Sequence, residues 1–183
     1  STYGAIPYFL SKTVVEVPQG FLQAVLIWVA FYGIAGLQGS FILHVCALWL
    51  TSMAAAATAL LVGCLASNPE VAIQASPPIF VVQLLFAGPF IPTSQIWEGF
   101  RWMQYLCALK YGINLIVINE FGNNTQIAND WSPTQRAMAD GFLEGIDVYQ
   151  ADWWIYLLVL IGLLCGFRCL AIFALTRRAQ AFF

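Results

Sequence analysis

The chain contains 183 residues, of which 61% are hydrophobic and 9% are charged, and its formal net charge is −2. Soluble domains carry about 25% charged residues, so a charged fraction this small cannot cover a surface that faces water. The composition therefore indicates a membrane protein. The apolar content excludes a disordered chain and collagen, and the lack of a basic excess excludes nucleic acid as a partner.

Long uncharged stretches predict four membrane-spanning helices in an all-α, polytopic bundle. No Asp, Glu, Lys or Arg occurs from Val17 to Pro69, which leaves room for two crossings because one crossing needs about 20 residues. A glycine-rich turn at 33–40 separates these two, and the helix-start pattern Asn68-Pro69 opens a third. The expected spans cover residues 18–36, 41–67, 69–91 and 153–176.

Residues 93–121 are apolar and aromatic, but Glu98, Arg101 and Lys110 interrupt them. Three charges argue against a crossing that faces lipid, so we expect this stretch to form re-entrant helices. Residues 122–152 follow as a polar, acid-rich segment, which we expect to be a large extracellular loop. Within it, Ser132-Pro133 can open a short helix.

The basic residues predict the orientation of the chain. Arg168, Arg177 and Arg178 gather near the end of the last span, which marks that end as cytosolic. Four crossings place the N-terminus on the same side, so both termini are expected in the cytosol, at a plasma or organelle membrane. The glycosylation sequon that begins at Asn123 then lies outside.

Residues 1–17 have the pattern of an amphipathic helix. Phe9 and Leu10 lie on an apolar face, whereas Lys12 and Glu16 lie on the opposite one. The pattern predicts a helix on the cytosolic membrane interface. The alternative is that this segment is simply the start of the first span.

Few residues are candidates for chemistry. His44 is the single histidine, and neither its span nor the neighbouring one contains an Asp or Glu to orient it, which favours helix packing over catalysis. The five cysteines lie in or beside apolar segments without histidine partners for a metal. No GxxxxGK[ST] phosphate-binding motif occurs, so we expect no catalytic residue, no metal site and no cofactor in this chain. Gln83 in the third span either contacts a transported substrate or bonds a neighbouring helix.

One run of motifs is more specific than these features. It comprises Gly88-Pro89-Phe90-Ile91-Pro92, Arg101-Trp102-Met103-Gln104-Tyr105, Lys110-Tyr111-Gly112 and Asn119-Glu120-Phe121. The run resembles the membrane domain of the G-subfamily ABC transporters, the White and breast-cancer-resistance half-transporters. Further resemblance to that domain is carried by Tyr8-Phe9-Leu10-Ser11-Lys12 with Glu16-Val17-Pro18, and by Phe167-Arg168-Cys169-Leu170-Ala171.

The resemblance implies that the chain supplies the last four spans of a six-span domain in an ATP-driven exporter of hydrophobic or amphipathic molecules, such as lipids, sterols or xenobiotics. It implies that ATP and Mg bind in a nucleotide-binding domain, expected on the same full-length polypeptide, and that a second half-transporter completes a dimer. This chain alone would then not be an enzyme. The residues that the resemblance assigns are Tyr8, Phe9, Leu10, Lys12 and Glu16 to a coupling helix, Phe80, Val81, Gln83 and Leu84 to a substrate cavity, and Pro89 and Phe90 to a gate.

Two other classes of protein stay open. The main alternative is a four-span membrane scaffold without transport activity, although such proteins usually carry cysteines in their outer loops and residues 122–152 contain none. An intramembrane lipid-modifying enzyme would need a His–Asp or His–Glu pair within the spans, and His44 is the single histidine.

Overall fold

The computed structural model describes residues 5–37, 39–87, 98–122 and 131–181. The elements, in chain order, are α1 (Ala5–Ala35), α2 (Phe41–Leu65), α3 (Pro69–Leu85), the 3-10 helix η2 (Glu98–Leu106), α4 (Ala108–Phe121), α5 (Pro133–Gly145), the 3-10 helix η4 (Gln150–Asp152) and α6 (Trp153–Ala181). Within these ranges there is no strand, and the predicted all-α fold is confirmed.

Three helical stretches are long and apolar enough to cross a membrane. They cover Phe9–Ala35, Phe41–Leu65 and Gln150–Arg177. The 17 residues of α3 make about 25 Å at 1.5 Å per residue, which is short of the hydrocarbon core of about 30 Å. The expected third span reaches to residue 91 and so includes residues outside the described ranges. A fourth crossing therefore stays a prediction.

The first helix joins two segments that the sequence treats separately. α1 runs from Ala5 to Ala35 with Pro18 inside it, so the amphipathic segment and the first apolar span form one rod. Whether its N-terminal part lies on the membrane interface, or is simply the start of the first span, stays a prediction. Beside the proline, Trp49 Nε1 of α2 donates a hydrogen bond to Val17 O over 3.2 Å, which ties the middle of α1 to α2.

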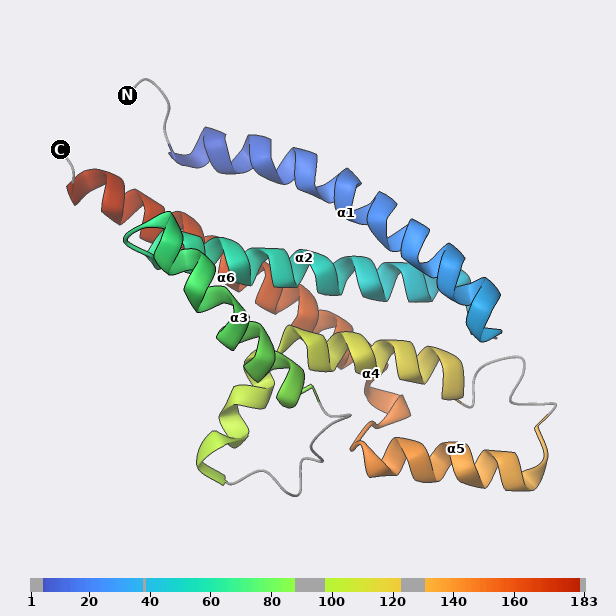
Figure 1. Cartoon of the computed structure of the whole chain (residues 1–183). Coiled ribbons are helices and arrows are strands. Elements are labelled where there is room, and N and C mark those ends of the chain that lie inside the picture. The colour runs from blue at the N-terminus through green and yellow to red at the C-terminus, as the bar shows by residue number, and fades with distance from the viewer. Residues whose placement is uncertain (1–4, 38, 88–97, 123–130, 182–183) are drawn as a thin grey trace.

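The central helix of the bundle is α2, which packs against α1, α4 and α6 (Figure 1). One buried cluster joins α2, α4 and α6, and a second joins α1 and α2. Their buried members are Ala54, Ala108, Tyr111 and Leu160 in the first, and Ala24, Trp28 and Val45 in the second. Small side chains at the first contact allow the helix backbones to approach closely, which is typical of helix packing in lipid.

The stretch that was expected to be re-entrant forms η2 and α4. The close approach of α4 to α2 depends on Gly112, where a Cβ atom would lie 2.0 Å from Thr51 Oγ1. Lys110, one of the charges that interrupt this stretch, donates from Nζ to Gln104 Oε1 over 2.8 Å. The buried amide of Gln104 thus gives the ammonium group a polar partner in apolar surroundings.

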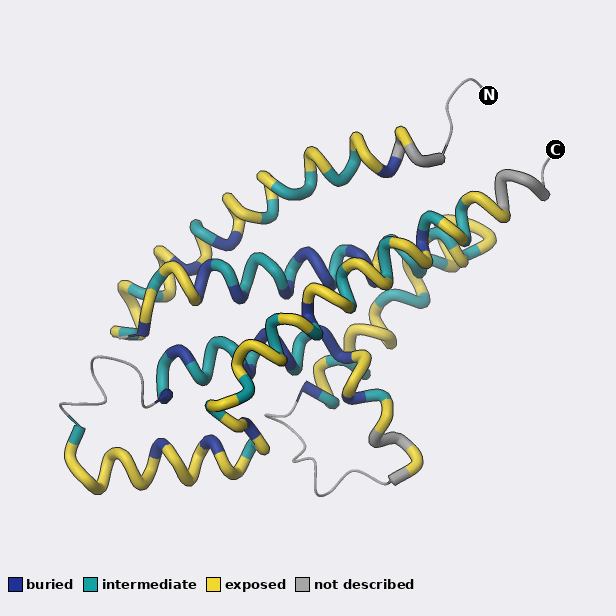
Figure 2. The backbone as a smooth tube through the Cα atoms, turned by 180° about the vertical axis from the view of Figure 1, so that it is seen from behind, coloured by how far each residue is buried: buried dark blue, intermediate teal, exposed yellow. Residues whose placement is uncertain are grey.

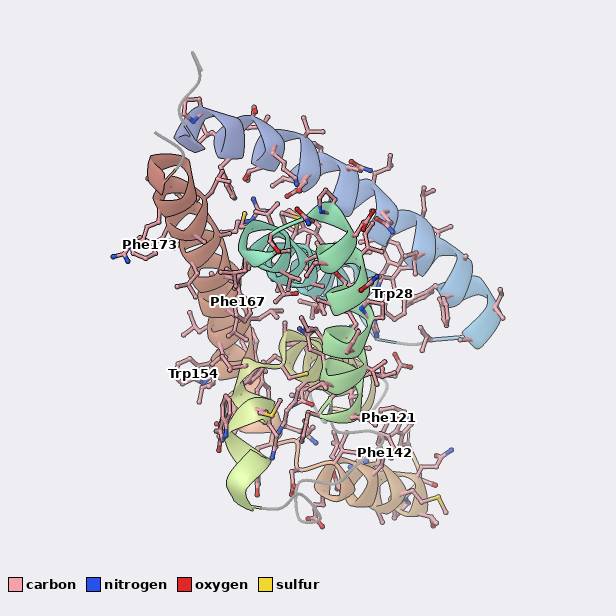
Figure 3. All side chains as sticks on the ribbon, turned by 60° about the vertical axis from the view of Figure 1, so that its left-hand side comes forward. Trp28, Phe121, Phe142, Trp154, Phe167 and Phe173 are labelled. Carbon is pink, nitrogen blue, oxygen red and sulfur yellow. The ribbon has the colours of Figure 1, made fainter. Side chains whose placement is uncertain are left out.

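The two ends of the bundle differ. Both termini lie at one end, and α5 lies at the other (Figure 1). The short helix expected at Ser132-Pro133 is present as α5, and it begins with a capping box in which Ser132 N donates to Gln135 Oε1 over 2.9 Å. α5 contacts the end of α4 through Phe121 and Phe142, whose ring centroids are 5.5 Å apart (Figure 3).

Exposed residues follow the length of α1 and α6 (Figure 2), and many of them are large and apolar. Leu26 and Ile34 on α1 are 62% and 88% exposed, and Leu170 and Phe173 on α6 are 52% and 56% exposed. Apolar surface of this extent is typical of helices that face lipid. The exposure therefore agrees with the composition in indicating a membrane protein.

Candidate functional site

The four residues expected to line a substrate cavity do lie together around one cavity of about 310 Å³. Phe80, Val81, Gln83 and Leu84 follow the i, i+1, i+3, i+4 spacing, which places them on one side of α3. α2 and α4 form the opposite wall with Thr51, Ala55 and Leu109. We call this space the α3 cavity.

The α3 cavity is apolar and open. None of the described residues that line it is charged. Phe80 and Leu84 are 39% and 45% exposed, so their side chains have surface left for a further contact. The hydroxyl of Thr51 donates to Ala47 O over 2.7 Å, which leaves the amide of Gln83 as the most polar group on the wall. Such a site can hold an apolar molecule and orient it with one hydrogen-bonding group.

Gln83 occupies a position between two cavities. Besides the α3 cavity, it lines a second apolar space of about 400 Å³ that α2, α3, η2 and α6 enclose, with Phe86, Trp102 and Phe167 among its wall residues. The backbone oxygen of Gln83 accepts a hydrogen bond from Cys107 Sγ over 3.0 Å. This contact connects α3 to the segment between η2 and α4. It uses the backbone of Gln83, so both alternatives stay open for the side-chain amide: contact with a transported substrate, or a hydrogen bond to a neighbouring helix.

Several other residues named from the sequence can be placed only in part. The gate residues Pro89 and Phe90 and the sequon residue Asn123 lie outside the described residues. Tyr8 is described through its backbone, which belongs to α1. Phe9 and Leu10, which share the expected apolar face, differ in exposure: Phe9 is buried and Leu10 is 67% exposed, so the described helices cover only part of that face.

Glu16, one of the two charged residues of the expected coupling helix, contacts the last helix. Arg168 Nη2 of α6 lies 2.8 Å from Glu16 Oε2, and Arg168 Nη1 donates to Thr13 Oγ1. Glu16 also lies 3.8 Å from Lys12 Nζ. We call the contact of Arg168 with Glu16 and Thr13 the α1–α6 clasp. From the sequence, Arg168 is a basic residue near a membrane surface, and the carboxylate that it pairs with is not evident.

A second polar group was missed by sequence reasoning. His44 is fully buried, and its Nε2 lies 3.7 Å from Glu120 Oε2 of α4. Asn119 Nδ2 donates to Ser40 O over 2.8 Å and lies 2.7 Å from His44 Nδ1. No carboxylate was expected near His44 because its own span and the neighbouring span contain none. The carboxylate of Glu120 comes instead from α4, which is distant in the sequence.

This group ties the start of α2 to the end of α4. Glu120 Oε2 accepts a hydrogen bond from Gly39 N over 2.9 Å, and Tyr32 OH donates to Gly39 O. A Cβ atom on Gly39 would lie 2.5 Å from Asn119 O, so only glycine fits here without movement. The motif Asn119-Glu120-Phe121 was the one signal in the sequence that pointed to these residues. Catalysis would also need a reacting group beside His44, and the neighbours described here are amide, carboxylate and aromatic groups that hold the helices together.

The described helices and cavities define a polytopic α-helical membrane protein with apolar sites between its helices. In the described part of the chain, no group of three or more His, Cys, Asp or Glu side chains is placed to hold a metal ion. The sequence model of the ABC-2 type transporter family matches residues 1–121. The chain belongs to this family.

Curated relatives support the narrower resemblance as well. Protein white of Ceratitis capitata is 27% identical over 187 residues, and Protein white of Drosophila melanogaster is 29% identical over 189 residues; each comparison covers 97% of this chain and 27% of the relative. The ABC transporter ATP-binding protein/permease wht-1 of Caenorhabditis elegans is 29% identical over 189 residues, which cover 97% of this chain and 28% of that protein. The resemblance to White-type G-subfamily transporters is therefore confirmed, and the chain spans little more than a quarter of the length of these relatives.

Proposed function

We propose that this chain is part of the membrane domain of an ATP-driven exporter that moves hydrophobic or amphipathic molecules, such as lipids, sterols or xenobiotics. The observation that carries the proposal is the α3 cavity, where Phe80, Val81, Gln83 and Leu84 line one apolar space. Membership of the ABC-2 type transporter family supports the transport activity. The apolar wall supports the class of substrate, because burial of apolar surface is the interaction that it offers.

ATP hydrolysis is proposed to occur outside this chain, in a nucleotide-binding domain that holds ATP and Mg. That domain is expected on the same full-length polypeptide. Its movement would reach the cavity through the N-terminal part of α1, where Tyr8, Phe9, Leu10, Lys12 and Glu16 lie. The α1 helix supports this role, because it joins this segment directly to the first apolar span, with Pro18 inside it as the position where the helix can bend.

The transport step is a shift between two conformations, one open toward the cytosol and one open toward the outside. A substrate is moved when its affinity differs between these two states. A second half-transporter is proposed to face the α3 cavity. The exposure of Phe80, Val81 and Leu84, at 39%, 54% and 45%, supports this, because these side chains would otherwise close only one side of the site.

The test uses the full-length transporter with Phe80→Ala. Loss of the ring removes apolar contact with substrate, so substrate-stimulated ATPase activity should fall more than basal activity does. Phe173→Ala is the matched control, since Phe173 is a similarly large, exposed ring on α6 that does not line the α3 cavity. Equal losses of stimulated and basal activity in the Phe80 variant, or the same change in the control, would contradict the assignment.

A further inference from the structure

A third cavity, of about 270 Å³, lies between α2, α4, α6 and η4. It shares no lining residue with the α3 cavity, and the proposed transport pathway does not use it. Most of its wall is aliphatic, with Leu43, Ala47 and Leu50 from α2, Leu115 and Ile118 from α4, and Leu157 from α6. We call it the α4 cavity.

One end of the α4 cavity is polar and reaches the surface of the molecule. Asn119 and Gln150 line this cavity together with Trp153. Leu43 and Trp153 are 54% and 51% exposed, so the cavity opens where α2 and α6 begin, near the end of the bundle that carries α5. The space therefore has an aliphatic interior and an entrance with aromatic and amide groups.

The surroundings of this entrance are apolar. Ile42 on α2 and Trp154 and Leu158 on α6 are 72%, 52% and 55% exposed, and both helices are long and apolar enough to cross a membrane. The apolar surface beside the entrance is of the kind that a bilayer would cover, and hydrocarbon chains would then be the most concentrated apolar molecules next to it.

Water is a poor occupant of this space. A buried water needs two to four polar partners, but most of the residues that line this cavity are aliphatic, and Asn119 Nδ2 already donates to Ser40 O. An apolar cavity of about 150 Å³ already admits a benzene molecule, and this one is larger. An unfilled space would forfeit dispersion contacts along its whole wall.

We infer that the α4 cavity binds one acyl chain of a bilayer phospholipid, with the head group at the Gln150 and Trp153 entrance and the chain between α2, α4 and α6. The bound chain would fill the space between α4 and the two membrane-spanning helices α2 and α6, and would stabilise the position of α4 against them. This lipid is distinct from a transported substrate, because it occupies a different cavity.

Photolabelling of the full-length protein tests the inference. The probe is a phosphatidylcholine that carries a diazirine group in its acyl chain, incorporated in nanodiscs with the protein and then irradiated. Adducts are expected on the α4 peptide that contains Leu115 and Ile118. This peptide is informative because every residue of α4 is buried or half-buried, so Leu115 and Ile118 have less contact with the surrounding lipid than the exposed residues of α6 have.

Two variants fill the cavity from different walls. In Ala47→Phe or Leu157→Trp, adducts on the α4 peptide should fall about tenfold, while adducts on the exposed Leu170 and Phe173 region of α6 stay unchanged. The control is Ala59→Phe, which adds the same ring to an exposed position of α2 that does not line the cavity. A wild-type protein without adducts on α4, or equal adducts in the wild type and both filled variants, would overturn the inference.

Discussion

The Arg168 guanidinium of α6 forms an ion pair with the Glu16 carboxylate of α1, with Nη2 and Oε2 2.8 Å apart. Their side chains are 14% and 25% exposed, so the pair is partly shielded from solvent. It connects the segment proposed to receive motion from the nucleotide-binding domain with the last helix of the chain. The α1–α6 clasp therefore gives α6 a direct contact with the coupling segment.

Removal of this charge should destabilise the contact. Because hydrogen bonds to charged groups contribute about 1.5–3 kcal/mol, we expect Arg168→Gln to lower the free energy of unfolding in mixed micelles by about that amount. Combining it with Glu16→Gln should cost less than the sum of the two single changes, because each removes the same pair. If the losses in the free energy of unfolding of the two single variants simply add in the double variant, the ion pair contributes nothing to stability. Arg177→Gln is the control, since Arg177 is exposed and lies over the Phe173 ring.

The α2–α4 contact predicts a compensating pair of substitutions. In Gly112→Ala the new Cβ would lie 2.0 Å from Thr51 Oγ1, and overpacking of this kind costs about 1–3 kcal/mol. Thr51→Ala removes Oγ1 and Cγ2 and leaves the Thr51 Cβ position 2.9 Å away. The double variant should therefore recover part of the stability that Gly112→Ala loses, as measured by thermal unfolding. A double variant less stable than Gly112→Ala would rule out this contact as the cause. Gly141→Ala on α5, where nothing lies within 4 Å of the added Cβ, is the control for loss of a helical glycine.

Two asparagines on α4 should respond in opposite ways to the same change. Asn119 donates to Ser40 O, whereas Asn114 is buried and its Nδ2 has no hydrogen-bond partner. Asn119→Leu leaves buried polar groups unpaired and should cost about 1–3 kcal/mol. Asn114→Leu removes an unsatisfied group, so it should be neutral or stabilising. Unfolding of both variants in the same detergent measures the difference, and a larger cost at position 114 would contradict the arrangement.

The proposed orientation can be tested from the two ends of the bundle. Met138 on α5 is 70% exposed, and Thr176 is exposed near the end of α6. In intact cells, a membrane-impermeant maleimide should label Met138→Cys in the full-length protein, and it should label Thr176→Cys only after permeabilisation. The unsubstituted protein gives the background from its own cysteines. The reverse pattern would place the termini outside.

The amino-acid sequence determined the elements of this protein that depend on local pattern. The uncharged run from Val17 to Pro69 was sufficient to predict two long apolar helices, because the length needed to cross lipid is a property of one segment. Ser132-Pro133 predicted the start of α5, since a capping box is made within a few residues. The motifs from Gly88 to Phe121 identified the family, and the same motifs led to the residues around the α3 cavity.

Only the tertiary structure decided which distant polar groups meet. Glu16 and Arg168 are 152 residues apart in the chain, and His44 and Asn119 are 75 apart. The sequence showed His44 without an acidic neighbour because it gives no register for α4 against α2. That register depends on Gly112 and Thr51, which allow the two backbones to approach closely. The α4 cavity also could not be predicted from the sequence. Its walls belong to α2, α4, α6 and η4, which are distant in the chain and meet only in the packed bundle.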